Sequence, residues 1–523
     1  MEILKKNIRM NRQKSKAVNQ ITLEEDMNVP DSKPDAGSII QESGNVKIED
    51  TKILDNQVLL SGYLEVKILY VSDSEDRQIH RLDTRLPFEE RLNLEGVEAG
   101  DNIRVKWDLE DLNVHLINSR KMSIQALVTF MASIEELYDT QAAVELHGME
   151  EISTRTKELQ PLSLAVQKKD ILRIKDEINL ASNKPNIGEL LWESVQLRGT
   201  DVRVMDGQLD IRGELFIFVL YAGDDENSTK QWIETAMPFQ GSIECSGCSS
   251  AMIPDVEISL AGSTLEVRPD YDGEERLIQL EVVLDLDIKL YEEESVEILS
   301  DVYSPVKELV PITSQEVYES LVIKNFSKCR AGERIRMEAN QPRMLQICHS
   351  KGEVKIDETR ITEKGIQVEG AVYVSILYIT ADDTLPFALM HGMVPFQHMI
   401  EVEGINQDCR YSLKTELEQL STMMIDSEEL EVKISVNLGV LIVQVHREDC
   451  IVDVEEHDLD LKKIQELPGI VGYIVQPGDS LWNIAKTYYT TPDRIMELNA
   501  LETEEVQPGN RLLIIKEAAS WQR

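Results

Sequence analysis

The chain has 523 residues and a formal net charge of −41, with 95 acidic against 54 basic side chains. That length is too great for one hydrophobic core and predicts roughly three to five domains of about 100–200 residues each. A strongly negative field repels phosphate groups, so we expect no nucleic-acid partner and no binding to a bare anionic membrane. The hydrophobic fraction of 42% is typical of a folded protein.

The first 16 residues depart from this acidic character, with six basic side chains and one acidic one. Two interpretations are open: a basic arm that contacts an acidic partner or lipid, and a solvated leading segment, which we favour. No apolar signal sequence follows, and no run of 18 apolar residues occurs. Six cysteines are too few for a secreted disulfide scaffold. We therefore expect a cytosolic protein without an integral membrane segment.

Three segments share one pattern of proline, glycine and aromatic residues, which indicates an internal repeat. In each, a strand-like run begins with Gly and ends with Tyr eight positions later. A Pro-Phe pair and a further Gly follow, and another Pro lies 28 residues upstream of the first Gly. The pattern recurs without insertion at offsets of 151 and then 157 residues. Its six positions in the first copy are Pro34, Gly62, Tyr70, Pro87, Phe88 and Gly96.

The repeated unit has the hydrophobic pattern of antiparallel β-structure. Residues 64–68 alternate apolar and polar side chains, as in a half-buried strand. Later in the unit, strand-like runs flank polar turns such as residues 269–273. We predict a mainly β protein with three sandwich-like antiparallel domains, and we interpret the recurring residues as structural. The expected domains are residues 1–155, 156–310 and 311–460.

The pattern changes near the C-terminus to that of a small mixed domain. Residues 472–488 have the pattern of a strand, a tight turn and a helix, and Ser480 is a good N-cap for that helix. A second helix is expected to begin at Thr491 and Pro492, because a capping residue followed by proline is typical of a helix start. Residues 511–515 form the last expected strand.

This order of elements resembles the LysM domain, and the matches include Tyr473, Val475, Ile484, Pro508 and Gly509. The resemblance implies a small βααβ domain over residues 471–516, after a linker at residues 461–470. It also implies a shallow groove for N-acetylglucosamine polymers between the first turn and the loop after the second helix. The groove positions are Gly478, Asp479, Ser480, Leu481, Asn499 and Leu501.

Two departures from the LysM pattern bear on the ligand of this groove. Ala500 replaces the usual glycine after Asn499, and three acids, Glu502, Glu504 and Glu505, crowd the rim. Peptidoglycan is also absent from the cytosol, where we expect the chain to remain. We therefore predict that the groove binds a protein, and binding of N-acetylglucosamine polymers is the alternative.

Three such repeats, of the SPOCS type, ahead of one LysM domain resemble the SipL-type proteins of spore-forming bacteria. A block at residues 28–35, which is matched at residues 179–186, and the Gly-to-Tyr strands carry this resemblance. It implies a non-enzymatic adaptor in spore coat assembly that acts in the mother-cell cytoplasm. The expected partner is an ATPase like stage IV sporulation protein A, which recruits the chain to the forespore surface. The alternative is an exported cell-wall protein that binds peptidoglycan.

The sequence lacks the common motifs of enzyme and cofactor sites. The sequence has no Walker A motif, no dinucleotide-binding glycine motif, no nucleophile elbow and no HExxH. Cys245 and Cys248 have the spacing of half a zinc site, but no second pair accompanies them, so we interpret them as part of a turn. We predict no catalytic residue, no metal and no cofactor. An enzyme with an unrecognised site in the repeats has only the acidic surplus in its favour.

Overall fold

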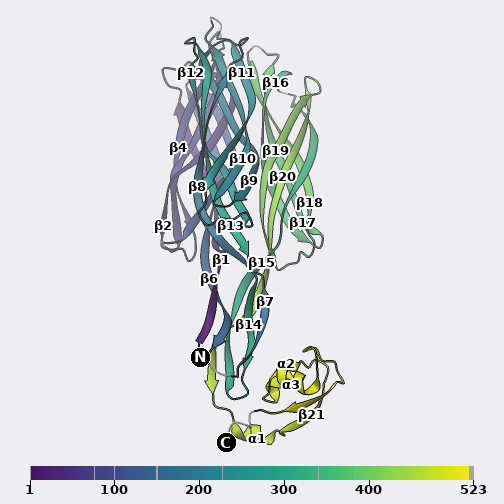
Figure 1. Ribbon diagram of the computed structural model, residues 1–523. Coiled ribbons are helices and arrows are strands. Elements are labelled where there is room, and N and C mark those ends of the chain that lie inside the picture. Colours follow the sequence, from purple (N-terminus) through teal and green to yellow (C-terminus); the bar gives the residue numbers. More distant parts are fainter. Residues whose placement is uncertain are drawn as a thin grey trace.

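The computed structural model describes residues 2–75, 77–98, 100–148, 151–225, 228–339, 341–382 and 384–517. Three sandwiches of strands stand side by side above a narrower stalk, and a small domain with helices lies beside the stalk (Figure 1). The predicted fold class, mainly β with three antiparallel repeats and a small C-terminal domain, is confirmed.

The first repeat is a sandwich of two three-stranded antiparallel sheets, with strand orders β2-β3-β4 and β1-β6-β5. Alternation along each strand turns one face of each sheet inward, and the two inward faces share one apolar core. Val66 and Ile68 of β3 and Val128 and Phe130 of β6 are completely buried in it. The strands are β1 (Glu2–Asn28), β2 (Ala36–Leu54), β3 (Gln57–Ser72), β4 (Ile79–Asn93), β5 (Asn102–Asn118) and β6 (Lys121–His147).

The second repeat has the same topology, with sheets ordered β9-β10-β11 and β8-β13-β12 around its own core. The strands equivalent to β1 and β6 are each interrupted in this repeat, so that β7 and β14 form a separate two-stranded ribbon. The strands are β7 (Ser153–Leu159), β8 (Leu162–Asn179), β9 (Ile187–Met205), β10 (Gln208–Gly223), β11 (Lys230–Glu244), β12 (Ile253–Pro269), β13 (Glu275–Glu293) and β14 (Val296–Tyr303).

The third repeat follows with sheets ordered β16-β17-β18 and β15-β20-β19, again around its own core. Its strands are β15 (Glu308–Arg336), β16 (Met344–Thr362), β17 (Gly365–Thr380), β18 (Phe387–Glu401), β19 (Cys409–Met424) and β20 (Glu429–His457).

The recurring residues of the repeat have structural roles. The Tyr70 hydroxyl group donates a hydrogen bond to the Pro34 carbonyl oxygen at 3.0 Å, and the equivalent bonds in the other repeats measure 3.2 and 3.1 Å. This bond ties the end of β3 to the loop before β2, which explains the constant spacing of the two residues. Gly62 lies where β3 crosses close to β2, and a Cβ atom there would lie 2.0 Å from the Lys47 carbonyl oxygen.

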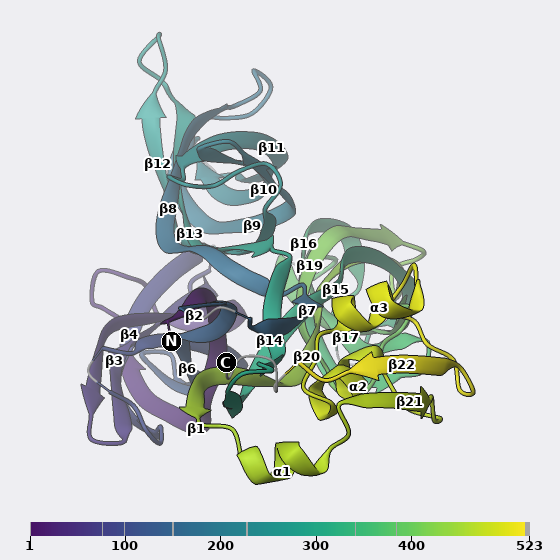
Figure 2. The same cartoon turned by 60° about the horizontal axis from the view of Figure 1, so that its bottom comes forward.

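The three sandwiches meet at a shared apolar cluster on a common axis (Figure 2). In each of β2, β9 and β16, a register shift leaves one residue unpaired. This bulged residue belongs to the axial cluster. The bulged residues are Ile40, Leu191 and Cys348, which occupy equivalent positions in the three repeats. The body therefore has approximate three-fold symmetry, with matching residues of all three repeats around the axis.

The stalk consists of three two-stranded ribbons, one from each repeat. They are the lower parts of β1 with β6, β7 with β14, and the lower parts of β15 with β20. Their apolar side chains form two small cores, in which Ile8, Val296 and Tyr318 come from three different ribbons. The stalk thus joins the repeats a second time, below the axial cluster.

The basic N-terminal segment forms the first half of β1, so its interpretation as a solvated leading segment is wrong. Lys6 pairs with Glu294 at 2.7 Å, and Arg12 pairs with Glu136 at 2.8 Å. The acidic partner of these side chains is the chain itself, because the neighbouring strands of the stalk carry an excess of carboxylates.

The C-terminal domain has the predicted order of elements. A short helix, α1 (Leu461–Glu466), lies within the predicted linker. Within the described part of the chain, no helix is both long and apolar enough to cross a membrane. The remaining elements are β21 (Ile470–Ile474), α2 (Leu481–Thr487), α3 (Pro492–Asn499) and β22 (Arg511–Ile515), with β21 and β22 antiparallel.

Candidate binding site on the C-terminal domain

The first predicted groove turn is fixed by its own hydrogen bonds. The Asp479 carboxylate accepts hydrogen bonds from the Tyr473 hydroxyl group and from the Gln476 backbone N–H, each at 2.7 Å. The bond from Tyr473 is the main cause that lowers the pKa of Asp479, so this carboxylate stays ionised. Gly478 has a φ of +91°, which favours glycine. The turn therefore needs no ligand to take up its shape.

Helix α2 begins directly after this turn, as the sequence predicts. The Ser480 side chain accepts a hydrogen bond from the Asn483 backbone N–H at 3.2 Å, which caps the helix. Leu481 is only 1% exposed and belongs to the apolar core of the domain. It therefore supports the fold and offers almost no contact area to a ligand.

The second predicted side of the groove begins at the end of α3. The Asn499 amide donates hydrogen bonds to the backbone carbonyls of Ile495 and Leu513, both at 2.8 Å, and its oxygen accepts one from the Leu513 N–H at 2.7 Å. Asn499 thus pairs with β22 as a strand residue would, and its side chain is already satisfied. Ala500 takes the left-handed conformation with a φ of +52°, where the LysM pattern has glycine.

Fewer residues of the predicted site are therefore exposed than the sequence positions of the groove suggest. Leu501 is half-buried against the core of the domain, whereas Gly478 is exposed. The rim acids Glu502, Glu504 and Glu505 are exposed. These carboxylates and the first turn make up the surface that a ligand can reach, and the groove itself stays a prediction.

A different face of the domain contacts the stalk, and sequence reasoning missed the residues involved. The Trp482 indole N–H donates to the Asp301 carboxylate at 2.8 Å, and the Lys486 ammonium group pairs with it at 2.8 Å. Tyr303 donates its hydroxyl hydrogen to the Thr490 carbonyl at 2.9 Å, and its ring lies edge-on to Trp482, with centroids 4.8 Å apart. The hydrophobic pattern of β14 does not distinguish Asp301 and Tyr303 from other strand residues.

The electrostatics of this contact favour a docked domain. Burial by itself raises the pKa of Asp301, but the hydrogen bonds from Lys486 and Trp482 lower it overall, so the carboxylate stays charged. Burial raises the pKa of Tyr303 to about 12. The contact uses α2 and the turn after it, whereas the described hydrogen bonds of the two groove turns stay within the C-terminal domain. Docking on the stalk therefore fixes the domain through a face other than the groove.

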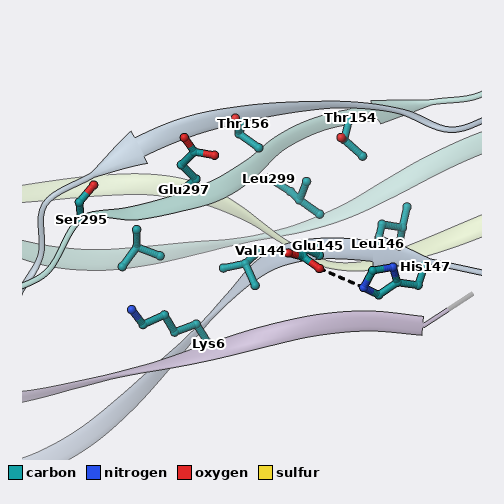
Figure 3. Close-up of a pocket in the computed structure, with 11 residues that line it drawn as sticks. Lys6, Val144, Glu145, Leu146, His147, Thr154, Thr156, Ser295, Glu297 and Leu299 are labelled. Atoms are coloured by element: carbon teal, nitrogen blue, oxygen red, sulfur yellow. Dashed lines mark ion pairs between the residues drawn. The ribbon is translucent and has the colours of Figure 1, made fainter.

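The stalk also carries a groove between its first and second ribbons (Figure 3). Its volume is about 530 Å³, and the lining mixes apolar side chains with hydroxyl and charged groups. His147 pairs with Glu145 at 3.0 Å, and the Ser295 hydroxyl group donates to Glu158 at 2.7 Å. The hydroxyl and the imidazole thus have separate carboxylate partners, which is not the arrangement of an activated nucleophile.

The cysteines are buried and free in the described structure. Cys248 donates a weak hydrogen bond to the Met205 carbonyl at 3.2 Å, and burial raises the pKa of Cys245 to about 11. The Cys245 side chain therefore stays a protonated thiol, and both cysteines lie in a turn, as the sequence predicts. Among the described residues, no group of three or more potential ligands could hold a metal ion.

Comparison with known families matches most of the repeated part and the C-terminal domain. The SipL SPOCS domain matches residues 35–117, 186–268 and 343–425, and the LysM domain matches residues 473–514. No curated protein and no solved structure matches the chain significantly.

Each SPOCS match spans the four strands between the first and the last strand of a sandwich, from β2 to β5 in the first repeat. The flanking strands complete the sandwich and build the stalk. SPOCS and LysM domains are non-catalytic binding domains. Together they support a sporulation-related adaptor that binds cell-wall material. With three SPOCS domains followed by a LysM domain, the chain is a SipL-like protein.

Proposed function

We propose that this chain is a non-enzymatic adaptor in spore coat assembly, which binds coat proteins at the forespore surface through its LysM domain and its repeats. The observation that carries the proposal is the fixed attachment of a LysM domain to a body built from three SPOCS domains. Asp301 and Tyr303 hold that domain by a face other than its predicted groove. A scaffold of this kind presents one binding surface in a defined position and loses little conformational entropy on binding.

The proposed partner is an ATPase like stage IV sporulation protein A, bound in the mother-cell cytoplasm. The exposed acids Glu502, Glu504 and Glu505 at the groove rim favour a partner surface with basic side chains. The alternative occupant, an N-acetylglucosamine polymer, is favoured by the LysM match itself. The side-chain amide of Asn499, a groove position of the LysM pattern, is hydrogen-bonded to β22. Fewer hydrogen-bonding groups are therefore free to bind a sugar.

The experiment follows a fluorescently tagged chain in sporulating cells and its co-purification with stage IV sporulation protein A. The double variant Glu502→Lys and Glu505→Lys reverses the rim charge without touching a described hydrogen bond. It should weaken co-purification at least about tenfold, as expected where like charges replace complementary ones. Glu466→Lys, on an exposed position of α1 outside the residues matched by the LysM domain, is the charge-reversal control and should behave as the unmodified chain.

Titration of the full chain with chitohexaose tests the alternative. Tight chitohexaose binding, together with normal recruitment of the rim variant, would contradict the protein-binding proposal and restore glycan binding. Recruitment that fails in the rim variant alone, without chitohexaose binding, supports it. Thermal unfolding of each variant shows whether the domain is still folded.

A further inference from the structure

The closed arrangement of the repeats allows three equivalent contacts to be compared. β4 lies against β9, and β18 lies against β2, so each repeat meets the next around the axis. We call these contacts the 1–2 junction, the 2–3 junction and the 3–1 seam. The offsets of 151 and 157 residues make Lys67, Phe218 and Ser375 equivalent, and likewise Arg81, Trp232 and Leu389, and Glu42, Glu193 and Ser350.

At the 1–2 junction, partly buried side chains of opposite charge form ion pairs between the two repeats. Glu193 of the second repeat lies 2.7 Å from the Lys67 ammonium group and 2.5 Å from the Arg81 guanidinium group of the first. Burial alone raises the pKa of Glu193, but the two cations offset this effect and keep it below its ordinary value. Lys289 and Glu135, which are 8% and 13% exposed, form a second pair across this junction at 2.5 Å.

The 2–3 junction uses an aromatic contact in the same place. The His349 ring stacks on Phe218 with centroids 4.2 Å apart, and its Nδ1 atom lies 2.9 Å from the Glu234 carboxylate. Lys414 also pairs with Asp255 across this junction. Both junctions therefore contain polar interactions between side chains of the two neighbouring repeats.

At the 3–1 seam, the third repeat has no cationic side chain at the two positions equivalent to Lys67 and Arg81. Ser375 and Leu389 occupy the positions that Lys67 and Arg81 occupy at the 1–2 junction. The Ser375 hydroxyl group faces its own repeat, 3.3 Å from His391. A short polar side chain and an apolar one therefore replace the two long cationic ones.

The carboxylate on the other side of the seam is still present. Glu42 is the equivalent of Glu193, and its described surroundings provide the nearby carboxylate of Asp111 rather than a cation. Burial and that like charge raise the pKa of Glu42 to about 7. The neighbouring Gln41 is buried, and its amide nitrogen has no hydrogen-bond partner in the described structure. The ion pair of Lys355 with Asp108, at 3.0 Å, does cross the seam.

We propose that the 3–1 seam is an opening line of the body, along which the third repeat separates from the first while the other two contacts stay closed. The axial cluster and the stalk include side chains of all three repeats, so the closed form predominates and the open form is a minor state. Opening uncovers Leu377 and Leu389 beside Tyr373 and Met393, which are already 46% and 48% exposed on the third repeat. The seam thereby converts an internal contact into an accessible apolar surface.

Single-molecule fluorescence transfer on the full chain tests this proposal. The dye positions Asp55→Cys, Asp206→Cys and Glu363→Cys are equivalent exposed turns of the three repeats, and the native cysteines are buried. Each pair of dyes therefore reports on one contact under matched conditions. We expect one narrow population for the 55/206 and 206/363 pairs and a second, lower-transfer population for the 363/55 pair.

Swapping the charge pattern between two contacts identifies the cause. Ser375→Lys supplies at the seam the cation that Lys67 supplies at the 1–2 junction, and it should reduce the open population by about fivefold, the effect of one partly exposed ion pair. Ser375→Gln is the matched uncharged control and should leave that population unchanged. Lys67→Ser should create a lower-transfer population for the 55/206 pair.

Each outcome bears on the proposal. A single narrow population for the 363/55 pair, as narrow as that of the 55/206 pair, overturns it. An open population that Ser375→Lys fails to reduce, or that Ser375→Gln reduces equally, overturns its electrostatic cause. The first measurement needs no charge-altering variant, so a Ser375→Lys chain that fails to fold leaves the proposal falsifiable.

Discussion

The 1–2 junction and the 3–1 seam are formed by equivalent strands of one repeated fold. Each contains a carboxylate at the same position of the repeat, but the charged surroundings of the two carboxylates are opposite. At the junction Glu193 has two cationic partners, whereas at the seam Glu42 has a carboxylate as its charged neighbour. The fold determines where these side chains lie, because their positions follow from the strand register. The divergence of the copies determines which contact is held by ion pairs and which is left weaker.

The largest expected effect is at the 1–2 junction. Lys289→Ala leaves the Glu135 carboxylate buried with two distant partners, Arg104 and Gln167, each at 3.5 Å. It should lower the free energy of unfolding by about 3 kcal/mol or more. Chemical denaturation monitored by tryptophan fluorescence measures this change. A loss below about 1 kcal/mol would show that the pair is solvated and that the junction is no stronger than the seam.

The next effect is at the seam and depends on pH. The pKa of Glu42 is about 7 in the folded chain and near 4.5 in the unfolded one. Between these values the folded state binds a proton that the unfolded state lacks, so stability falls as pH rises through this window and then levels off. Glu42→Gln should therefore stabilise the chain by about 2–3 kcal/mol at pH 8 and by much less at pH 5.

The matched control for this pH dependence is Glu193→Gln at the 1–2 junction. Because its carboxylate is paired with Lys67 and Arg81, this change should destabilise the chain at pH 8. Unfolding of both variants at the two pH values makes the comparison. An equal effect of Glu42→Gln at pH 5 and pH 8 would mean that the carboxyl group is solvated.

The smallest effect is expected for the ion pair that does cross the seam. Lys355 and Asp108 have side chains that are 25% and 33% exposed, so water screens their attraction. Lys355→Ala should change the free energy of unfolding by about 1 kcal/mol or less. A loss of stability as large as that for Lys289→Ala would show that the 3–1 seam is held by ion pairs as strongly as the 1–2 junction.

The fold was predictable wherever a physical requirement recurs within each copy. Pro34 and Tyr70 share a hydrogen bond, and Gly62 leaves room for a close strand crossing, so both features appear at fixed spacing in the sequence. The LysM helices were predictable from their caps, because Ser480 and Thr491 accept the expected backbone hydrogen bonds. Such local interactions involve few residues and leave a readable pattern.

The contacts between the repeats left no such pattern. Lys67, Phe218 and Ser375 share a position but differ in chemistry, so comparing the copies conceals their roles. The stalk was missed because its strands alternate poorly and mix charged with apolar residues. Asp301 and Tyr303 were missed for a related reason: their partner surface lies about 180 residues away in the chain.

The predicted site was only partly accessible to sequence reasoning. Family positions identify the turns correctly as turns, but they do not separate residues that face a ligand from residues that hold the fold. Leu481 is buried in the core and Asn499 is bonded to β22, so the reachable surface consists of the first turn and the acidic rim. A helix pattern with Leu481 on its apolar face already indicated a core role for that residue.

Amide hydrogen exchange on the unmodified chain, followed by mass spectrometry, tests most directly whether the body is weakest at the seam. It compares β2 with its equivalent β9, and β18 with its equivalent β4, which removes differences of strand position. We predict faster exchange in β2 and β18, because opening of the seam exposes both, and slower exchange in β9 and β4 at the paired junction. Equal exchange in the equivalent strands, or faster exchange in β9 and β4, would contradict this account.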